Sequence, residues 1–527
     1  MSSQWEEIVK QKRLAQQQAL ELYTAKSVKT QGHLNEISEI DQLLSLYASG
    51  EANVEAVVRC YIEAAISAHK QTNCLTEITF DDAVKDAVAL DKAPDMVDTT
   101  RSPLHGVPMT LKDQFNVEGY DSTIGYVGRA LKPASSDAIL VKMLRSLGAV
   151  ILGKTNLPQS IMWCETENPL WGLTTNPMSS AYTPGGSTGG ESALLALKGS
   201  MVGWGTDIGG SIRIPSHMMG LYGLKPSSAR LPYNGVPVST EGQEHVPSSV
   251  GPMARSLSSI KHVMHSLINA EPWTYDARCA PIPWRDEVYQ SFLSKPLTIG
   301  FLLDDGVVRP HPPITRVLNS AVEALKAAGH DVFEWDATLH PECIAVMDAF
   351  YSADGGMDIR TDVSVAGEPF IPHVERLVNR GDAISVYEYW QLNRKKWALQ
   401  QTYLEKWKTL KSPKTGRTAD IIIMPPMPHP SVPHGGTRWV GYTKVWNVLD
   451  YTALVIPGGK VQVQDTEATW DYQPRNDADE WNAGIWKERA EEMAELKLPI
   501  GLQIVGRKLE EEKVLAVGKV LDDLLVR

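Results

Sequence analysis

The stretch YTPGGSTGGESALLALKGSMVGWGTDIGGSIRIPSHMMGLYGLKP, residues 182–226, decides how the rest of the chain is interpreted. It holds two serines, Ser187 and Ser211, each in a glycine-rich turn. Glycine lets a backbone turn sharply and approach a ligand closely, and successive N–H groups in such a turn form an anion-binding nest. A serine beside such a nest is typical of a nucleophile next to a site for developing negative charge. Short helices are predicted at 191–197 and 212–219.

Composition narrows the class of protein. The 527 residues are 43% hydrophobic, enough for a large core, and the net charge of −12 argues against a nucleic-acid partner. Five scattered cysteines without a C-x-x-C pair favour reduced thiols. The first 26 residues are polar, unlike a signal peptide, and no apolar run approaches the roughly 18 residues of a membrane span. We therefore expect a cytoplasmic protein with no membrane span. The sequence leaves open whether it forms a homodimer.

Outside the central stretch, helical periodicity alternates with short apolar runs. The i, i+3, i+4 pattern predicts a half-buried helix at 51–70. A helix, a glycine and a strand follow one another at 138–152 and again at 313–335, and strands are expected at 421–424, 453–457 and 499–506. This alternation predicts an α/β fold. Residues 3–25 predict a helix that either lies on the body as an arm or stays solvated. Residues 465–497 are expected to be a surface excursion.

A lysine upstream supplies the base that a serine nucleophile needs. Lys112 ends the apolar run in GVPMTLKD, residues 106–113, which allows burial. Burial lowers the pKa of a lysine from its usual value near 10.4, and a neutral lysine can accept a proton from serine. The alternative is an exposed lysine or one paired with Asp113, which would be the better interpretation of an isolated lysine.

Two segments carry a family resemblance. GTDIGGSIRIP at 205–215 and GVPMTLKD at 106–113 resemble the hallmarks of the amidase signature family. The whole chain resembles the branch of fungal acetamidases, with fatty acid amide hydrolase as a more distant relative. The resemblance implies an α/β/α sandwich with a mixed central sheet covered by helices. It also implies one domain overall, with a helical region at 1–95 packed on a catalytic domain at 96–527.

The resemblance also implies an activity and roles for single residues. It implies an amidase that cleaves a carboxylic amide to acid plus ammonia or amine through an acyl-enzyme on Ser211, without a cofactor. Ser187, preceded by a cis peptide bond, would bridge Ser211 and the base Lys112. Backbone amides of the glycine turn would form the oxyanion hole: Ile208, Gly209, Gly210 and Ser211. Supporting roles are expected for Thr188, Thr206, Asp207 and Arg213, and substrate binding for Ile161, Met162, Trp163 and Ile208.

Several of these residues also allow other interpretations. Residues 185–189 also match G-x-S-x-G, but no buried strand precedes them, as a nucleophile elbow requires. His217 follows Ser211 by six residues on a predicted helix and is expected to face elsewhere. No metal-binding spacing occurs, and His429 and His434 are weak metal candidates. Trp163 and Trp171 form either an apolar wall of the site or part of the ordinary core. The proline-rich loop at 425–436 is expected to lie over the cleft of the active site.

Two further functions stay open at this point. One is an acyl transferase or esterase of secondary metabolism, which would use the same acyl-enzyme. The other is a subunit of an amidotransferase complex, against which the acidic charge and the acetamidase-like C-terminal half argue.

Overall fold

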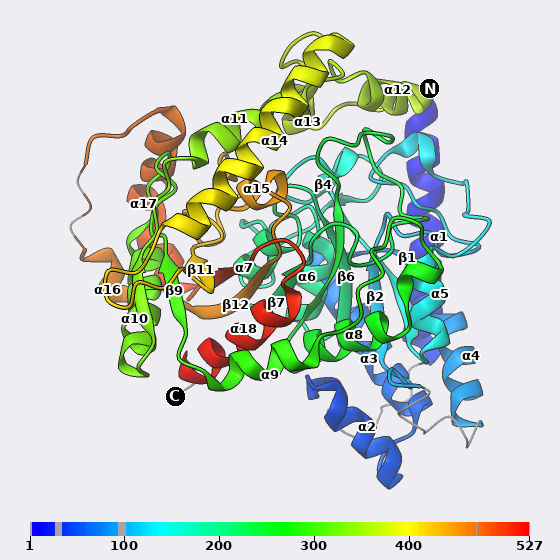
Figure 1. The fold of residues 1–527 in the computed structure, drawn as a ribbon. Helices are drawn as coiled ribbons and strands as arrows, with labels where there is room; N and C mark the ends of the chain where they lie inside the picture. Colours follow the sequence, from blue (N-terminus) through cyan, green and yellow to red (C-terminus); the bar gives the residue numbers. More distant parts are fainter. Residues whose placement is uncertain (1–2, 27–33, 93–101, 469, 471, 526–527) are drawn as a thin grey trace.

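A mixed sheet of eleven strands runs through the centre of the molecule (Figure 1). A computed structural model of the chain describes residues 3–26, 34–92, 102–468, 470 and 472–525. The strands lie in the sheet in the order β1 (Leu75–Ile78), β3 (Val150–Thr155), β2 (Pro108–Lys112), β6 (Val202–Asp207), β8 (Ser249–Ala254), β7 (Tyr222–Lys225), β12 (Ala453–Lys460), β13 (Pro499–Val505), β11 (Ile421–Met424), β9 (Thr298–Phe301) and β10 (Asp331–Glu334).

Strand direction varies across the sheet. β2 is parallel to both β3 and β6, and β9 is parallel to both β10 and β11, while the pairs between these two groups are antiparallel. Strands covered on both faces are continuously apolar, as in the fully buried β11. The strands predicted at 421–424, 453–457 and 499–506 are confirmed as β11, β12 and β13. A separate pair consists of β4 (Glu167–Asn168) and β5 (Gly172–Leu173).

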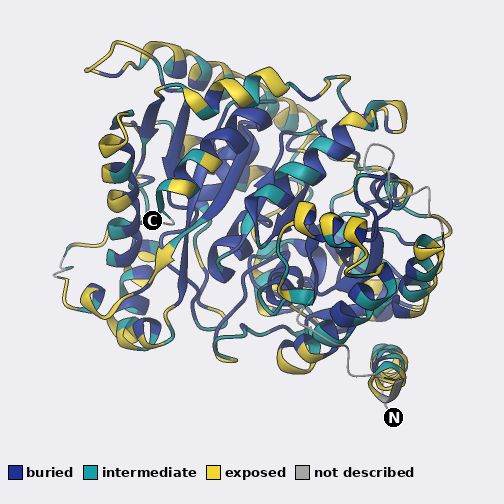
Figure 2. Ribbon diagram, turned by 90° about the horizontal axis from the view of Figure 1, so that it is seen from below, coloured by how far each residue is buried: buried dark blue, intermediate teal, exposed yellow. Residues whose placement is uncertain are grey.

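Helices cover both faces of the sheet, so the predicted sandwich is confirmed. Exposed residues lie on the outward faces of these helices, and the central strands are buried (Figure 2). None of the helices in the described residues is long and apolar enough to cross a bilayer. The helices are α1 (Gln4–Lys26), α2 (Ile40–Ser49), α3 (Val54–Thr72), α4 (Phe80–Asp91), α5 (Ile139–Ser146), α6 (Gly189–Ala196), α7 (Arg213–Met219), α8 (Leu257–Asn269), α9 (Asp286–Ser294), α10 (Pro312–Ala327), α11 (His340–Tyr351), α12 (Met357–Ala366), α13 (Pro372–Val378), α14 (Val386–Thr409), α15 (Gly441–Val448), α16 (Val463–Thr466), α17 (Asp477–Glu495) and α18 (Glu511–Leu525).

The N-terminal helix α1 is an arm that lies on the body, which settles the alternative left by the sequence. Lys12 Nζ lies 2.5 Å from Glu77 Oε1 and 2.8 Å from Asp121 Oδ2, and Arg13 Nε donates to the Leu170 carbonyl at 2.7 Å. The region 1–95 also supplies β1, an edge strand of the main sheet. The boundary expected between residues 95 and 96 lies outside the described residues.

Several elements differ from the sequence-based expectation. The strands β6, β7 and β8 were not predicted, because glycines interrupt the apolar alternation of β6 (VGWGTD). The surface segment expected at 465–497 is wrong in part, since its helix α17 buries Ile485, Trp486 and Met493. Asn476 caps the start of that helix, because its side chain accepts hydrogen bonds from the backbone of Ala478 and Asp479.

A run of helices from α11 to α14 forms a cap along one side of the molecule, at the top in Figure 1. This cap, residues 340–409, separates β10 from β11 in the chain. The sequence did not predict its helices. It supplies one wall of the pocket described next.

Candidate active site

Two neighbouring parallel strands bring the predicted base and the glycine turn together. Lys112 is the last residue of β2, and the turn at 208–211 directly follows β6, which pairs with β2. The carboxyl ends of parallel neighbours meet at one edge of a sheet, where α/β proteins commonly place their sites. Ser187 precedes α6 and Ser211 precedes α7, and the Thr188 N–H donates to the Ser211 carbonyl at 3.2 Å. The structure therefore gathers the predicted residues at one edge.

Lys112 is buried and directed at Ser187. Its Nζ donates to Ser187 Oγ at 2.7 Å and to Thr206 Oγ1 at 3.1 Å. Burial lowers the pKa of Lys112 to about 7, although the charge of Asp207 acts in the opposite sense. The alternative pairing with Asp113 does not occur, because that carboxylate accepts from Thr123 N–H at 2.9 Å and from other donors around it.

The turn before α6 holds Ser187 in place. The Gly186–Ser187 peptide bond is cis, as expected, and Gly185 has a φ of +86°. A Cβ on Gly186 would lie 2.7 Å from the Glu165 amide nitrogen, so only glycine fits. Ser187 is 1% exposed and Ser211 is 9% exposed. Among the described residues no hydrogen bond joins the two serine hydroxyls, and the Thr188 hydroxyl is buried without a partner.

A buried carboxyl group beneath the two turns orients α6. Glu191 on α6 accepts hydrogen bonds from the hydroxyls of Thr110 on β2 and Thr155 on β3, the latter at 2.8 Å. Burial raises the pKa of Glu191 to about 8, so the group is largely neutral at pH 7. Gly203 on β6 leaves the space that this side chain occupies, since a Cβ there would overlap its carboxyl group.

A buried ion pair fixes the turn before α7. Arg213 Nη2 lies 2.9 Å from Asp207 Oδ1 and Arg213 Nε 3.0 Å from Oδ2, with both side chains fully buried. The remaining guanidinium donors reach Gln503 and Asn447, each at 2.7 Å. Burial opposes ionisation of Asp207, but Arg213 holds the pKa of that carboxyl well below its usual range. The supporting position expected for Arg213 and Asp207 is therefore occupied by a complete polar network.

The glycine turn presents fewer free amides than the sequence suggested. The Gly210 N–H, one of the four expected oxyanion-hole donors, donates to Asp207 Oδ1 at 2.8 Å. Within the described residues, the amides of Ile208, Gly209 and Ser211 have no hydrogen-bond acceptor. Three of the four expected donors thus remain available to a ligand.

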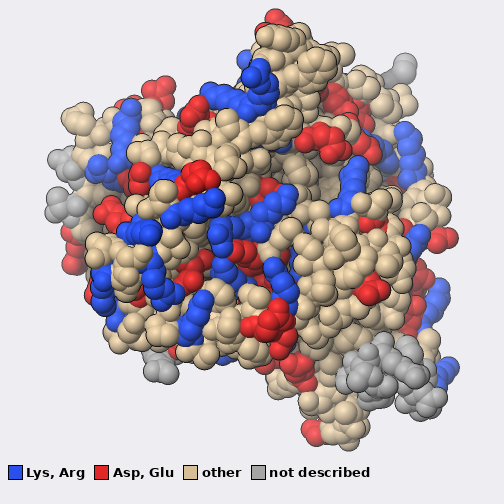
Figure 3. All heavy atoms as spheres, viewed as in Figure 1, with Lys and Arg blue, Asp and Glu red and all other residues tan. Residues whose placement is uncertain are grey.

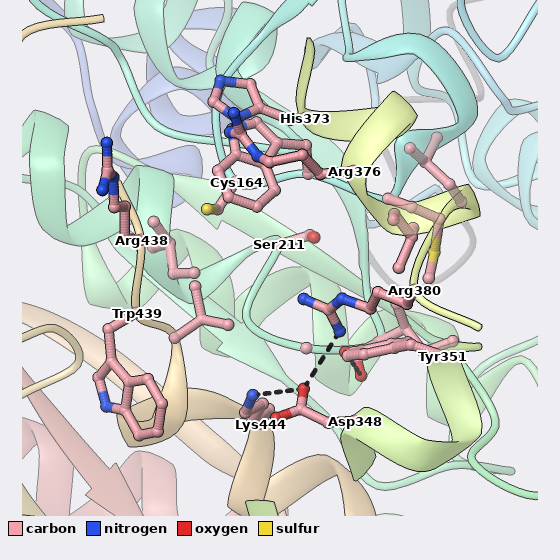
Figure 4. Close-up of a pocket in the computed structure, with 18 residues that line it drawn as sticks. Cys164, Ser211, Asp348, Tyr351, His373, Arg376, Arg380, Arg438, Trp439 and Lys444 are labelled. Atoms are coloured by element: carbon pink, nitrogen blue, oxygen red, sulfur yellow. Dashed lines mark hydrogen bonds and ion pairs between the residues drawn. The ribbon is translucent and has the colours of Figure 1, made fainter. Parts of the chain in front are cut away.

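A cavity of about 510 Å³ opens beside Ser211 (Figure 4). Its wall includes the four predicted substrate-binding residues Ile161, Met162, Trp163 and Ile208. Trp163 stacks on His373 with ring centroids 4.1 Å apart. Trp171, for which the sequence left site wall and core packing as alternatives, does not line the cavity: it lies in the core, where its Nε1 donates to Thr123 at 3.3 Å.

Much of the cavity wall was not predicted from the sequence. The proline-rich loop at 425–436 does not line the cavity; the residues that follow it, Arg438, Trp439 and Val440, do. The cap contributes six further residues: Asp348, Tyr351, His373, Arg376, Leu377 and Arg380. They meet Ser211 only through tertiary packing, so no local pattern in the sequence marks them.

The candidate histidines His217, His429 and His434 do not line the cavity. His217 is buried on α7, where its Nε2 lies 2.9 Å from the His429 carbonyl and its Nδ1 accepts from Gly501 N–H at 2.9 Å. Burial lowers the pKa of His217 to about 4. Across the described residues, no three His, Cys, Asp or Glu side chains gather as a metal site, and the five cysteines are buried.

Comparison with solved structures identifies the class. Fatty acid amide hydrolase superposes with a TM-score of 0.85 at 30% identity, over 99% of this chain and 90% of that one. The α/β/α fold and the serine turns at the sheet edge therefore define an enzyme of the amidase-signature type.

Comparison with families and sequences then identifies the family. A model described as "Amidase" matches residues 56–515. "Amidase 1" of Gibberella moniliformis is 51% identical over the full length of both chains, and "Acetamidase" of Aspergillus oryzae is 35% identical over 99% of both. The chain belongs to the amidase family, and the resemblance to fungal acetamidases is confirmed.

Proposed function

We propose that the protein hydrolyses a carboxylic amide through an acyl-enzyme on Ser211, with Ser187 as relay and Lys112 as base. One observation carries the proposal: a buried lysine, unpaired with any carboxylate in the described residues, lies 2.7 Å from Ser187. Because burial lowers the pKa of Lys112 to about 7, a large fraction is neutral at physiological pH. A neutral amine at this distance accepts the hydroxyl proton of Ser187.

The proposed reaction uses this arrangement. As Lys112 takes the Ser187 proton, Ser187 takes the proton of Ser211, whose Oγ forms a bond to the amide carbonyl carbon. The carbonyl π electrons move onto oxygen, and the amides of Ile208, Gly209 and Ser211 stabilise the oxyanion. When the C–N bond breaks, the proton returns through Ser187 to the leaving amine. Water then attacks the acyl-enzyme by the same route and releases the acid.

The first test separates the two serines. Ser211→Ala should abolish both turnover and labelling by a serine-directed fluorophosphonate, because it removes the atom that forms the covalent bond. Ser187→Ala should lower the rate less, since water can partly replace a relay. Ser180→Ala, an exposed serine, is the matched control and should retain full activity.

Two outcomes would contradict the assignment. One is labelling that persists in Ser211→Ala while circular dichroism shows a folded protein. The other is a Ser187→Ala variant as inactive as Ser211→Ala, which would contradict a relay that water can partly replace. Product analysis with added amines or alcohols distinguishes hydrolysis from acyl transfer, because both reactions share the acyl-enzyme.

A further inference from the structure

The cavity beside Ser211 is lined by more positive than negative charge. Four basic side chains contribute to its wall: Arg376, Arg380, Arg438 and Lys444. Asp348 is the one carboxylate that lines it. His373 adds no charge at neutral pH, because burial and the nearby arginines lower its pKa to about 4. On the face shown in Figure 3, Lys and Arg are interspersed with Asp and Glu. The excess is unexpected in a protein with a net charge of −12.

Asp348 neutralises part of this charge. Lys444, which is buried, places its Nζ 2.7 Å from Asp348 Oδ1. Arg380 Nη1 lies 3.8 Å from the same oxygen, too far for a hydrogen bond (Figure 4). One carboxylate therefore pairs with Lys444 and leaves Arg380 largely unsatisfied.

Most donors of the three arginines have no acceptor. Within the described residues, the side chains of Arg380 and Arg438 form no hydrogen bonds, and neither Arg376 nor Arg438 pairs with a carboxylate. Arg438 lies over Trp481, with its guanidinium carbon 3.4 Å from the ring centroid, and Arg376 Nη2 donates to His373 Nδ1. Arg380 extends from the end of α13 toward the middle of the cavity in Figure 4.

We infer that the substrate is an amide that carries a carboxylate, which Arg380 binds while the amide carbonyl reaches Ser211. Arg376 and Arg438 flank this site and contribute to its positive potential. A guanidinium presents paired N–H donors that match the two oxygens of a carboxylate. A positive cavity in an acidic protein also attracts anions and repels cations. The inference names the substrate class of the proposed function and rests on that function.

Two matched pairs of substrates test the inference. In the first, the carboxylate is on the acyl part: succinamate against 4-methylpentanamide, in which isopropyl replaces the carboxylate. In the second it is on the amine part: N-acetyl-β-alanine against N-isopentylacetamide. We expect the wild-type enzyme to favour the anionic member of at least one pair by about tenfold or more in kcat/KM, the effect of one charge-assisted contact. Added salt should reduce that preference.

Variants assign the preference to Arg380. Arg380→Gln should remove the preference, because kcat/KM should fall about tenfold more for the anionic amide than for the neutral one. Arg380→Glu should disfavour the anionic amide further. Arg394→Gln, an exposed arginine on α14 outside the cavity, is the matched control and should behave as wild type.

The results separate this inference from the proposed function. Equal or better turnover of the neutral member in both pairs, or a preference unchanged in Arg380→Gln, would overturn the carboxylate site while amide hydrolysis stands. If no amide is hydrolysed, the proposed function fails, and calorimetry decides the inference alone. Succinamate or N-acetyl-β-alanine should then bind Ser211→Ala and bind the Ser211→Ala, Arg380→Gln double variant about tenfold more weakly. Failure of both ligands to bind, or equal binding to both proteins, would overturn the inference.

Discussion

At the scale of single residues, the chemistry depends on Lys112 being neutral. Burial lowers the pKa of this lysine to about 7, so below pH 7 it holds a proton and cannot accept one. We expect kcat to rise from pH 5 to pH 9 with a midpoint near 7, measured on an amide whose chemical step limits the rate. Lys112→Met should lower kcat by about 10²–10⁴-fold and remove this limb. A flat profile in the wild-type enzyme would contradict a lysine base.

The pair Asp207–Arg213 makes a prediction about stability. Both side chains are fully buried, and removing one partner leaves an uncompensated charge. We expect Arg213→Met to lower the free energy of unfolding by about 3–5 kcal/mol, measured by urea denaturation. The exposed pair Lys326–Glu323 supplies the control, since Lys326→Met should cost less than about 1 kcal/mol. Similar losses in the two variants would show that the pair does not stabilise the turn.

At this scale, short motifs were the useful signal in the sequence. Lys112, Ser187 and Ser211 lie in motifs whose family resemblance implied that they act together, and the structure brings Lys112 and both serine turns to one edge of the sheet. The hydrogen bond of the Gly210 N–H could not be predicted in this way, because it depends on where the Asp207 carboxylate points. The place of Arg380 in the cavity wall could not be predicted either, because only the packing of the cap brings it there.

At the scale of elements, α17 offers a direct test of a helix start. The Asn476 side chain accepts from the amides of Ala478 and Asp479 at 3.0 and 3.1 Å. Asn476→Ala should cost about 1 kcal/mol, because these amides lose their acceptor. Asn269→Ala, at the exposed end of α8, is the control and should change stability by less than about 0.5 kcal/mol. Equal urea midpoints for the two variants would argue against the cap.

Helices and strands were predicted where their hydrophobic pattern in the sequence is strong, and missed where it is weak. The isoleucine run of β11 was predicted to the residue, because a fully buried strand is continuously apolar. The strand β6 was missed, since Gly203 and Gly205 weaken its pattern while making room for Glu191 and Thr188. The acidic start of α17 resembled a surface loop, although acidic residues also suit the first turn of a helix.

At the scale of the whole molecule, we expect the purified chain to act alone. The described structure already brings Lys112, both serines and a cavity together in one chain. Purified protein should therefore hydrolyse simple amides without ATP, a partner protein or added metal, and EDTA should leave the rate unchanged. Activity that requires ATP and a second protein would favour an amidotransferase subunit instead. Loss of activity with EDTA, restored by zinc, would contradict the metal-free reaction.

The placement of the cap has an evolutionary consequence. The groups proposed to break the amide bond come from residues 112–213, whereas Arg376, Arg380 and their neighbours come from residues 340–380. Because the two stretches are far apart in the gene, mutation or recombination can alter the cap without touching the reactive serines. Related enzymes can therefore acquire new substrate specificities by changes in the cap while they inherit the reactive serines unchanged.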